Sequence, residues 1–423
     1  MSNAVRAAFQ SVTSMTLPHL PIEQSDFAVD PMPYLEAARR QHPWLAKCSV
    51  GYVIHGYQAT KDLMWMDDKL RTSNDSVTEI MGAKDTNWGR FIDNQILALS
   101  GAEHARVRSS VAQAFTPRNI NRHRSTMRDV VARLLDEWAP KKKFDYAEFA
   151  SYFPIIITCA VVGASPDAIS PLRKAMETLG VQFSLDPSLL PAFEESYNLI
   201  EDFVDKLVRE REENSGGEEE DTLNSLIASR NAGVINDQEL RSLLVFIFLA
   251  GYDTSKNILT LIMHAMLQHP EMWERCAVDR AYCGKVVEEI FRFSTVASPY
   301  RTVAEDFEYD GVKLTKGTLL VFALPLAGRD PSTFSDPMEF RPERDHANRH
   351  IAFGRGAHMC LGQHLAKIQI EEGIHVIAQR ITKPKLAGEV TWRPFTGVWG
   401  IRTLPIEFVP APAQVHEVSP AHS

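Results

Sequence analysis

One long apolar segment limits the folds that are open to this chain. Asn236 and Glu239 have the spacing of a helix N-cap with its capping box. The helical pattern then continues to Gln268 and ends at His269-Pro270, because proline cannot continue a helix. A helix of roughly 32 residues is about 48 Å long, enough to cross a whole domain. We therefore expect a large fold built around one central helix.

The rest of the chain is predominantly helical in pattern. Further helices are predicted near residues 33–41, 57–70, 102–114, 121–138, 145–163, 167–183, 191–212, 271–294 and 361–380. A β-hairpin is predicted at 46–56, and short strands are predicted at 295–325, with turns at Asp310-Gly311 and Lys316-Gly317, and at 389–408. Residues 71–100 are predicted to be a long loop and 212–221 an acidic surface connector. The predicted fold class is mainly α with a small β-rich region, with one domain over 1–410 and a disordered tail over 411–423.

Composition excludes several classes of protein. The chain has 423 residues and a net charge of −9, and its pI near 5.9 argues against a nucleic-acid-binding protein. The best apolar run, residues 243–251, is too short to cross a bilayer, and the N-terminus lacks the pattern of a signal peptide. The five cysteines are scattered and form no CxxC pair, which argues against a disulfide framework or a structural zinc site. We expect a cytoplasmic monomer that binds neither membrane nor nucleic acid.

A glycine-rich loop leads to a cysteine near the start of the last predicted helix. Residues 353–362 read Phe-Gly-Arg-Gly-Ala-His-Met-Cys-Leu-Gly. Amide groups at a helix N-terminus stabilise a thiolate, and the glycines allow close approach of a flat ligand. A lone cysteine after a turn is more often a buried structural residue. The whole ten-residue pattern instead favours Cys360 as a thiolate ligand to an iron that performs oxygen chemistry.

This loop resembles the haem-binding loop of the cytochrome P450 family, F-x-x-G-x-x-x-C-x-G. Three further motifs occur in the family's order. Residues 104–108 (HARVR) resemble its H-x-x-x-R, residues 250–254 (AGYDT) its A-G-x-[DE]-T, and residues 289–292 (EIFR) its E-x-x-R. The resemblance implies the triangular, helix-rich P450 fold, with haem b between the long helix and the cysteine loop. It also implies a monooxygenase whose metal ligand is Cys360.

The resemblance assigns further residues to the haem site. It implies that Thr254 orients water and that Asp253 relays protons from solvent. Without the resemblance, Asp253 could face solvent and Thr254 could bond back to the preceding turn. Glycine at position 251 is expected to open space on that face of the helix. The expected cofactor-binding residues are His104, Arg108, Ala250, Gly251, Arg301, Phe353, Gly354, His358, Cys360 and Gly362, of which His104, Arg108, Arg301 and His358 are the candidate partners of the haem propionates.

Glu289 and Arg292 lie three residues apart and share a helix face. An isolated E-x-x-R is usually a weak surface pair. The resemblance implies instead a buried pair, joined by Arg344, that supports the cysteine loop.

Substrate contacts are expected in several segments around the haem. By family position, an apolar pocket would be formed by Phe91, Ile96, Phe183, Phe248, Val296 and Val398. Ordinary core packing is an equally good interpretation of each of them. An apolar pocket favours a hydrophobic substrate such as a terpenoid, an aromatic compound or a steroid-like molecule. The sequence identifies neither the substrate nor the position that is oxidised.

The chain has no G-x-G-x-x-G dinucleotide motif after a strand. Electrons are therefore expected from a separate protein, an iron–sulfur ferredoxin with its flavin reductase. An acidic partner could dock on basic residues near the cysteine loop, although most of these are expected to be simply solvated: Arg106, Arg118, Arg349, Arg355 and Lys367. Two alternatives stay open, a peroxygenase- or dehydratase-type haem enzyme and a non-catalytic haem sensor. Asp253 and Thr254 favour the oxygen-using enzyme over the first.

Overall fold

The computed structural model describes residues 9–165, 169–214 and 221–412. Its α-helices are α1 Ser25–Val29, α2 Met32–Arg39, α3 Tyr57–Leu63, α4 Asn74–Met81, α5 Asn87–Asn94, α6 Gly101–Ala112, α7 Pro117–Asn121, α8 Arg124–Trp138, α9 Tyr146–Val162, α10 Ile169–Leu179, α11 Leu190–Glu213, α12 Thr222–Asn231, α13 Asp237–Met266, α14 Pro270–Val278, α15 Arg280–Phe293, α16 Leu324–Ala327 and α17 Gln363–Arg380.

The strands form several small sheets. They are β1 Gln10–Ser11, β2 Leu45–Lys47, β3 Tyr52–Ile54, β4 Leu70–Thr72, β5 Lys143–Asp145, β6 Ala297–Ser298, β7 Tyr300–Val303, β8 Phe307–Tyr309, β9 Val312–Leu314, β10 Leu319–Phe322, β11 Ile381–Leu386, β12 Thr391–Trp392, β13 Gly397–Val398, β14 Ile401–Thr403 and β15 Pro405–Pro410. The largest sheet has the order β2-β3-β10-β7-β4. Two three-stranded sheets, β1-β9-β8 and β11-β15-β5, and the pairs β12-β14 and β13-β6 complete the described strands.

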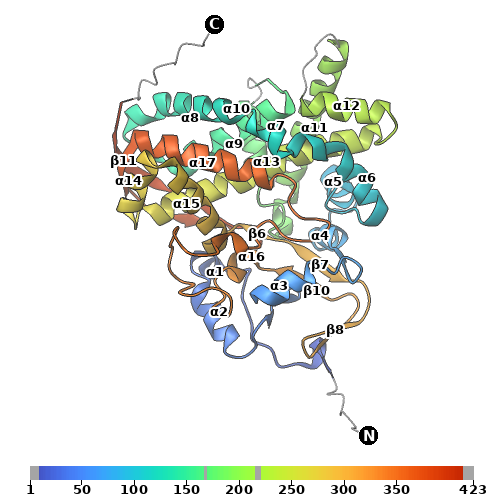
Figure 1. Cartoon of the computed structure of the whole chain (residues 1–423). Helices are drawn as coiled ribbons and strands as arrows, with labels where there is room; N and C mark the ends of the chain where they lie inside the picture. Colours follow the sequence, from blue (N-terminus) through green and yellow to red (C-terminus); the bar gives the residue numbers. More distant parts are fainter. Residues whose placement is uncertain (1–8, 166–168, 215–220, 413–423) are drawn as a thin grey trace.

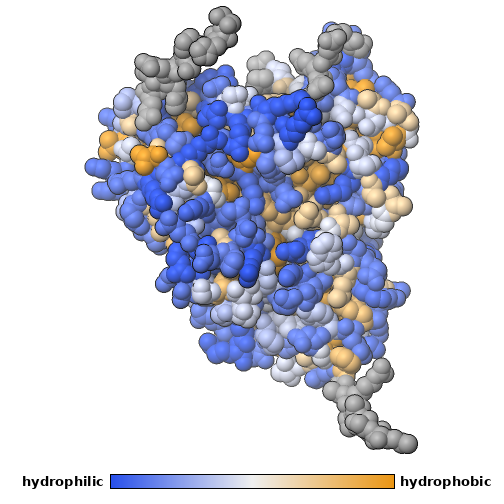
Figure 2. Space-filling view, in the orientation of Figure 1, coloured by the Kyte–Doolittle hydropathy of each residue, from blue (hydrophilic) through white to orange (hydrophobic). Residues whose placement is uncertain are grey.

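The long helices and the main sheet occupy opposite ends of the molecule. In Figure 1 the long helices fill the upper part of the view, while β7, β8, β10 and helices α1 to α3 form a narrower lower part. The molecule is therefore broad at its helical end and tapers toward the β-rich end, as the predicted fold class requires. Figure 2 shows a face that is mostly hydrophilic, with apolar residues in small scattered groups.

The central helix α13 begins as predicted. Asn236 Oδ1 accepts a hydrogen bond from the Glu239 amide at 2.8 Å, and a Glu239 carboxylate oxygen accepts one from the Asn236 amide at 2.8 Å, so the capping box is complete. α13 packs against α9, α10, α11 and α17. An 18-residue window of α13 is apolar enough for a membrane span and is longer than the apolar run at residues 243–251. However, 78% of that window is buried inside the fold. Such burial is typical of a core helix.

Several predicted boundaries are wrong. The helix predicted at 57–70 ends at Leu63, and the segment predicted as a loop at 71–100 contains α4 and α5. The carboxylate of Glu194, on α11, accepts hydrogen bonds from the amides of Asn87 and Trp88 at 2.9 Å each. Thr86 also caps α5 locally by accepting a hydrogen bond from the Gly89 amide at 2.9 Å. The start of α5 is therefore held both by a local N-cap and by a distant part of the chain.

Other helices also differ from expectation. The helix predicted at 271–294 is divided into α14 and α15, because Asp279 caps the second helix by accepting a hydrogen bond from the Tyr282 amide at 3.0 Å. α12 lies where no element was predicted, and α17 begins at Gln363 rather than Leu361. Residues 166–168, 215–220 and 413–423 lie outside the described residues, and with them parts of the predicted helix at 167–183, the acidic connector and the tail.

Candidate functional site

A largely apolar cavity of about 390 Å³ lies between α13 and the cysteine loop, a size typical of small-molecule sites. α13 contributes residues from Leu243 to Ile258 to its wall, and the cysteine loop contributes residues from Ala352 to Gly362. α6, the end of α10, the segment around β6 and β7, and β13 complete the enclosure. The long helix and the cysteine loop, which are far apart in sequence, therefore face one another across one space.

The cysteine loop adopts a conformation that requires glycine. Gly354 and Gly356 have φ values of 69° and 75°, a region that other residues rarely adopt. A Cβ atom on Gly356 would lie 2.6 Å from the carbonyl oxygen of Met64. The Cys360 amide donates to the Phe353 carbonyl at 2.8 Å. Cys360 is a free thiol that is accessible from the cavity.

The protein alone does not favour the Cys360 thiolate. Burial raises the pKa of the thiol, although a hydrogen bond from the Gly362 amide and the charge of Arg108 oppose this rise. A coordinated metal ion deprotonates a thiol outright. The geometry and chemistry of this loop thus fit a cysteine that becomes a thiolate when it ligates iron.

Four basic side chains line the cavity near the cysteine loop: His104, Arg108, Arg301 and His358. The imidazole rings of His104 and His358 have centroids 4.2 Å apart, and Nδ1 of His358 is buried without a hydrogen-bond partner. Burial and, to a lesser extent, the charges of Arg301, His104 and Arg108 together lower the pKa of His358 to about 3. The ring is therefore neutral near pH 7 and can donate a single hydrogen bond.

The two arginines of this group form no ion pair with an acidic side chain of the described residues. Arg108 Nη2 donates to the Met359 carbonyl at 2.6 Å, and Arg301 Nη1 donates to the Tyr300 carbonyl at 2.8 Å. Burial lowers the pKa of both guanidinium groups. Buried cations without counterions are costly. The cluster therefore fits a bound group that brings two carboxylates, as haem b does.

On α13, Thr254 lines the cavity beside Ala250 and Gly251. Its Oγ1 donates to the Ala250 carbonyl at 3.0 Å, the back-bonding arrangement that the sequence left open. Gly251 lines the cavity and has a second, packing role that was not expected. A Cβ atom there would lie 2.6 Å from Oγ1 of Thr158 on α9, so this glycine permits close packing of α9 against α13 as well as lining the cavity.

Asp253 does not face solvent. Its Oδ1 accepts a hydrogen bond from Arg393 Nη1 at 2.5 Å, and both side chains are almost fully buried. Burial raises the pKa of Asp253, and Arg393 opposes the rise. Oδ2 of Asp253 and Nη2 of Arg393 have no partner among the described residues. Asp253 is thus a buried acid that is only partly satisfied by hydrogen bonds and lies next to Thr254.

A second ion pair lies close enough to Asp253 for its charges to act on that carboxyl group, and it reaches the surface. Lys256 Nζ lies 2.5 Å from both carboxylate oxygens of Glu177 on α10, and the Tyr252 hydroxyl donates to the same carboxylate at 2.8 Å. The side chain of Glu177 is 36% exposed, whereas that of Lys256 is 3% exposed. Sequence reasoning missed Arg393 and Glu177 as partners of this site, because each comes from a different part of the chain.

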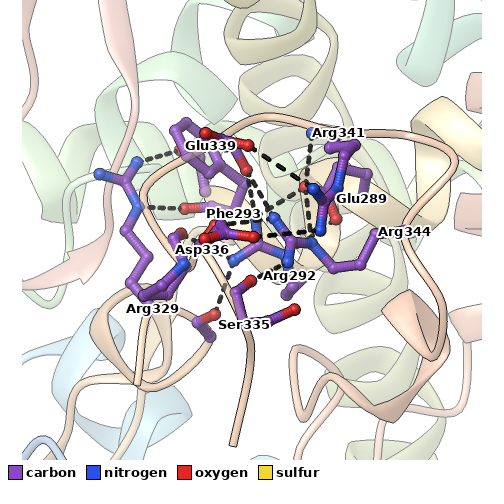
Figure 3. A network of polar contacts seen from close by, with 12 residues as sticks. Glu289, Arg292, Phe293, Arg329, Ser335, Asp336, Glu339, Arg341 and Arg344 are labelled. Atoms are coloured by element: carbon purple, nitrogen blue, oxygen red, sulfur yellow. Dashed lines mark hydrogen bonds and ion pairs between the residues drawn. The ribbon is translucent and has the colours of Figure 1, made fainter. Parts of the chain in front are cut away.

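Below the cysteine loop, Glu289 and Arg292 form a fully buried ion pair. Arg292 Nη2 and Nε donate to the two carboxylate oxygens of Glu289 at 2.6 and 2.8 Å. The remaining donors of Arg292 reach the carbonyl oxygens of Gly328, Pro337 and Glu339 at 2.9 to 3.0 Å. Figure 3 shows Arg292 between Glu289 and the loop that carries Ser335 to Glu339. The pairing expected from the resemblance is present.

Arg344 joins this network, again as expected. Its Nε lies 3.4 Å from Glu289, and its Nη2 donates to the carbonyl oxygens of Asp336 and Glu339 at 2.8 and 3.0 Å. Arg344 also donates to the Ser335 carbonyl. The network therefore holds the turn-rich segment before the cysteine loop against α15.

Four of the six apolar residues predicted for the substrate pocket line the cavity, namely Ile96, Phe183, Val296 and Val398. The other two predictions, Phe91 and Phe248, are wrong, because these rings pack in the core and do not line the cavity. The ring centroid of Phe91 lies 5.1 Å from that of Tyr197, and that of Phe248 lies 5.5 Å from that of Phe203.

The basic residues proposed to dock a partner are not equivalent. Arg106 pairs with Glu239 at 2.6 Å, and Lys367 pairs with Glu288 at 2.6 Å, while Arg355 lies beside Tyr57. Arg118 and Arg349 are exposed and form no ion pair within the described part of the chain. Arg355 likewise forms no ion pair in the described residues, but unlike the other two it is half-buried.

Comparisons with known proteins agree with this geometry. The family model described as Cytochrome P450 matches residues 52–382. Luteothin monooxygenase of Streptomyces thioluteus is 30% identical over 397 residues, which cover 93% of this chain and 96% of that protein. The polyketide biosynthesis cytochrome P450 PksS of Bacillus subtilis is 29% identical over 327 residues, 75% of this chain and 78% of that protein.

Solved structures show the same fold. The crystal structure of CalO2 superposes with a TM-score of 0.84 at 20% identity, over 93% of this chain and 100% of that one. With the cavity, the accessible cysteine and the unpaired basic cluster in place, the sequence match over most of the chain identifies the family. This protein belongs to the cytochrome P450 family and is a haem b-dependent monooxygenase.

Proposed function

We propose that this enzyme inserts one oxygen atom from O₂ into a hydrophobic small molecule, by hydroxylation or epoxidation, with electrons delivered by a ferredoxin-type iron–sulfur protein. The observation that carries the proposal is the cavity itself, in which Cys360 on one side faces Thr254 and Asp253 on the other. Its mostly apolar wall favours a hydrophobic substrate over a charged one. Terpenoid, aromatic, steroid-like and polyketide substrates all fit this description.

The proposal gives each group at the cavity a role. Haem b bound through Cys360 would supply the chemistry of O₂ activation. His104, Arg108, Arg301 and His358 would hold its propionates, and Ala250, Gly251, Phe353, Gly354 and Gly362 would border its faces. Thr254 would hold water near the reacting oxygen. Asp253, with one oxygen free of partners, would receive protons and pass them to that water.

Protons would reach Asp253 from solvent by way of Glu177 and Lys256. Glu177 is in contact with solvent, and it pairs with Lys256, one helical turn from Tyr252 and Asp253 on α13. Since burial raises the pKa of Asp253, this carboxyl group holds a proton at a higher pH than an exposed aspartate would. Such a group suits proton transfer near neutral pH.

The remaining features of the proposal concern partners and location. We propose a cytoplasmic monomer, supported by the burial of α13 in the core and by the hydrophilic face in Figure 2. The absence of a dinucleotide-binding motif in the sequence supports a separate electron donor. Arg118 and Arg349 would attract an acidic ferredoxin to the side of the cysteine loop.

The first experiment is the absorbance spectrum of the dithionite-reduced protein with carbon monoxide. We expect a Soret band strongly red-shifted from that of a histidine-ligated haem, and we expect Cys360→Ser to lose it. The matched control is Cys48→Ser, at a half-buried cysteine away from the loop, which should keep the band. A band at the position of histidine-ligated haem, or no haem in well-folded protein supplied with haem, would overturn the proposal.

A further inference from the structure

The short turn after α10, residues 180–184, forms part of the cavity wall. Gln182 and Phe183, within this turn, both line the cavity wall. Gln182 is 9% exposed, so its amide is removed from bulk solvent. An amide in such surroundings is costly unless both of its ends find hydrogen-bond partners.

Three other segments of the chain hold this turn in place. Trp88 Nε1, on α5, donates to Gln182 Oε1 at 3.0 Å. The Tyr300 hydroxyl, on β7, donates to the Phe183 carbonyl at 3.0 Å, and Thr396 Oγ1, before β13, donates to the Ser184 carbonyl at 3.4 Å. Because the turn is held at consecutive residues, the Gln182 side chain has little freedom, and a ligand would lose little entropy in binding to it.

The bond from Trp88 also fixes which end of the Gln182 amide is free. An indole N–H can only donate, so the amide atom facing it must be the oxygen. The amide nitrogen is therefore the free end, and the one hydrogen bond that joins the Gln182 side chain to another of the described residues goes through its oxygen. Gln182 thus offers two N–H donors at the wall of a mostly apolar cavity, while its oxygen is engaged by Trp88.

A second amide lies on the same helix as Trp88. Gln95 directly follows α5, seven residues after Trp88, and is therefore near the same helix face. It lines the cavity, is 1% exposed, and has an amide nitrogen without a partner. Two nearly buried amides thus border one cavity, each with unsatisfied hydrogen-bonding capacity.

We infer that Gln182 determines substrate specificity by donating a hydrogen bond to a carbonyl oxygen, so that the enzyme selects carbonyl-bearing hydrophobic substrates over plain hydrocarbons of the same shape. Trp88 is the positioning residue that keeps the donor end of Gln182 directed away from α5, and Gln95 borders the same region. This inference rests on the proposed function, because it names the substrate class of that same cavity.

The test is binding of matched ketones and hydrocarbons to the haem-loaded protein, followed by the low-to-high-spin shift. The probes are adamantanone with adamantane, fluorenone with fluorene, and androstanone with androstane. For at least one pair we expect the ketone to bind about fivefold to tenfold more tightly, as one net hydrogen bond would give. Gln182→Met, similar in length but without the amide, should abolish this ratio and leave hydrocarbon affinity unchanged.

Trp88→Phe separates positioning from packing. It should reduce the ketone-to-hydrocarbon ratio while Gln182 is intact, whereas a purely structural effect would weaken both members of a pair alike. The inference is overturned if no ketone binds, if no pair shows a preference for the ketone, or if Gln182→Met weakens ketone and hydrocarbon equally. The carbon monoxide spectrum of the same samples tests the thiolate ligand, so a failure of the proposed function is recognised separately.

Discussion

Two buried networks of charges lie on opposite sides of the cysteine loop and the cavity, and they differ in completeness. Around Glu289, Arg292 uses all three of its nitrogen atoms in hydrogen bonds, and Arg344 adds further bonds to the loop before Cys360. Around Asp253, one carboxylate oxygen and one nitrogen of Arg393 have no partner among the described residues.

The difference indicates different roles. A fully satisfied buried network fixes one arrangement and costs several kcal/mol to break. An incompletely satisfied one keeps a site for water or a proton, at a cost in stability that only a functional gain explains. The Glu289 network therefore holds the fold under the cysteine loop, and the Asp253 network is suited to proton transfer.

The largest effect is expected when the hydrogen-bond network around Glu289 is broken. Glu289→Gln removes the charge that faces two buried arginines, and we expect a loss of about 3–5 kcal/mol in the free energy of unfolding. The measurement is urea denaturation, with haem content recorded in parallel. The control is Glu210→Gln, which breaks the exposed Lys206–Glu210 pair and should cost less than about 1 kcal/mol. Equal effects of the two variants would contradict the structural role.

Asp253→Asn should act mainly on catalysis. The side chain keeps its shape but can no longer exchange a proton, so we expect kcat to fall about 100-fold. Because the buried Arg393 would lose the charge that it pairs with, we also expect a loss in the free energy of unfolding. Product formation is measured with a compound that gives the spin-state shift, with the carbon monoxide band as a check on the haem ligand. An unchanged kcat would remove Asp253 from the proton route.

Arg393→Gln tests the role of Asp253 through the pH dependence of kcat. Arg393 opposes the rise that burial imposes on the pKa of Asp253, so its removal should raise that pKa further. The alkaline limb of the kcat profile should then move to higher pH, because Asp253 keeps the proton that it donates up to a higher pH. Arg402→Gln, at an exposed arginine on the neighbouring β14, is the control and should leave the profile in place.

The smallest effect is expected at Glu177, the partly exposed partner of Lys256. Burial would raise the pKa of Glu177, but Lys256 and Arg393 outweigh it and the pKa is lowered. The stabilisation from this carboxylate is therefore present above the unfolded value near pH 4.3 and is lost as pH falls below it. Because the side chain is 36% exposed, Glu177→Gln should cost about 1 kcal/mol or less at pH 7. The difference from wild type should vanish in acid, and a difference that grows in acid would contradict this assignment.

Much of the fold follows from local patterns. The capping box of α13, the turn glycines of the cysteine loop and the spacing of Glu289 and Arg292 all act within a few residues, so sequence reasoning placed them correctly. α4 and α5 were missed because apolar periodicity is poor in their segment and polar residues are frequent there. Thr86 caps α5 locally, but the contact with Glu194, 107 residues from Asn87, has no local signal.

The family, the cysteine of the haem loop, the basic cluster and the buried Glu289–Arg292 pair could all be predicted from the chain, because each depends on residue types at fixed short spacings. Three contacts became visible only in the folded molecule: the pairing of Asp253 with Arg393, 140 residues away, the space that Gly251 leaves for Thr158, and the bond by which Trp88 orients the amide of Gln182. These contacts join side chains from distant elements. Which of these side chains meet depends on how helices and strands pack together, and the pattern within one segment does not show which distant segment it will contact.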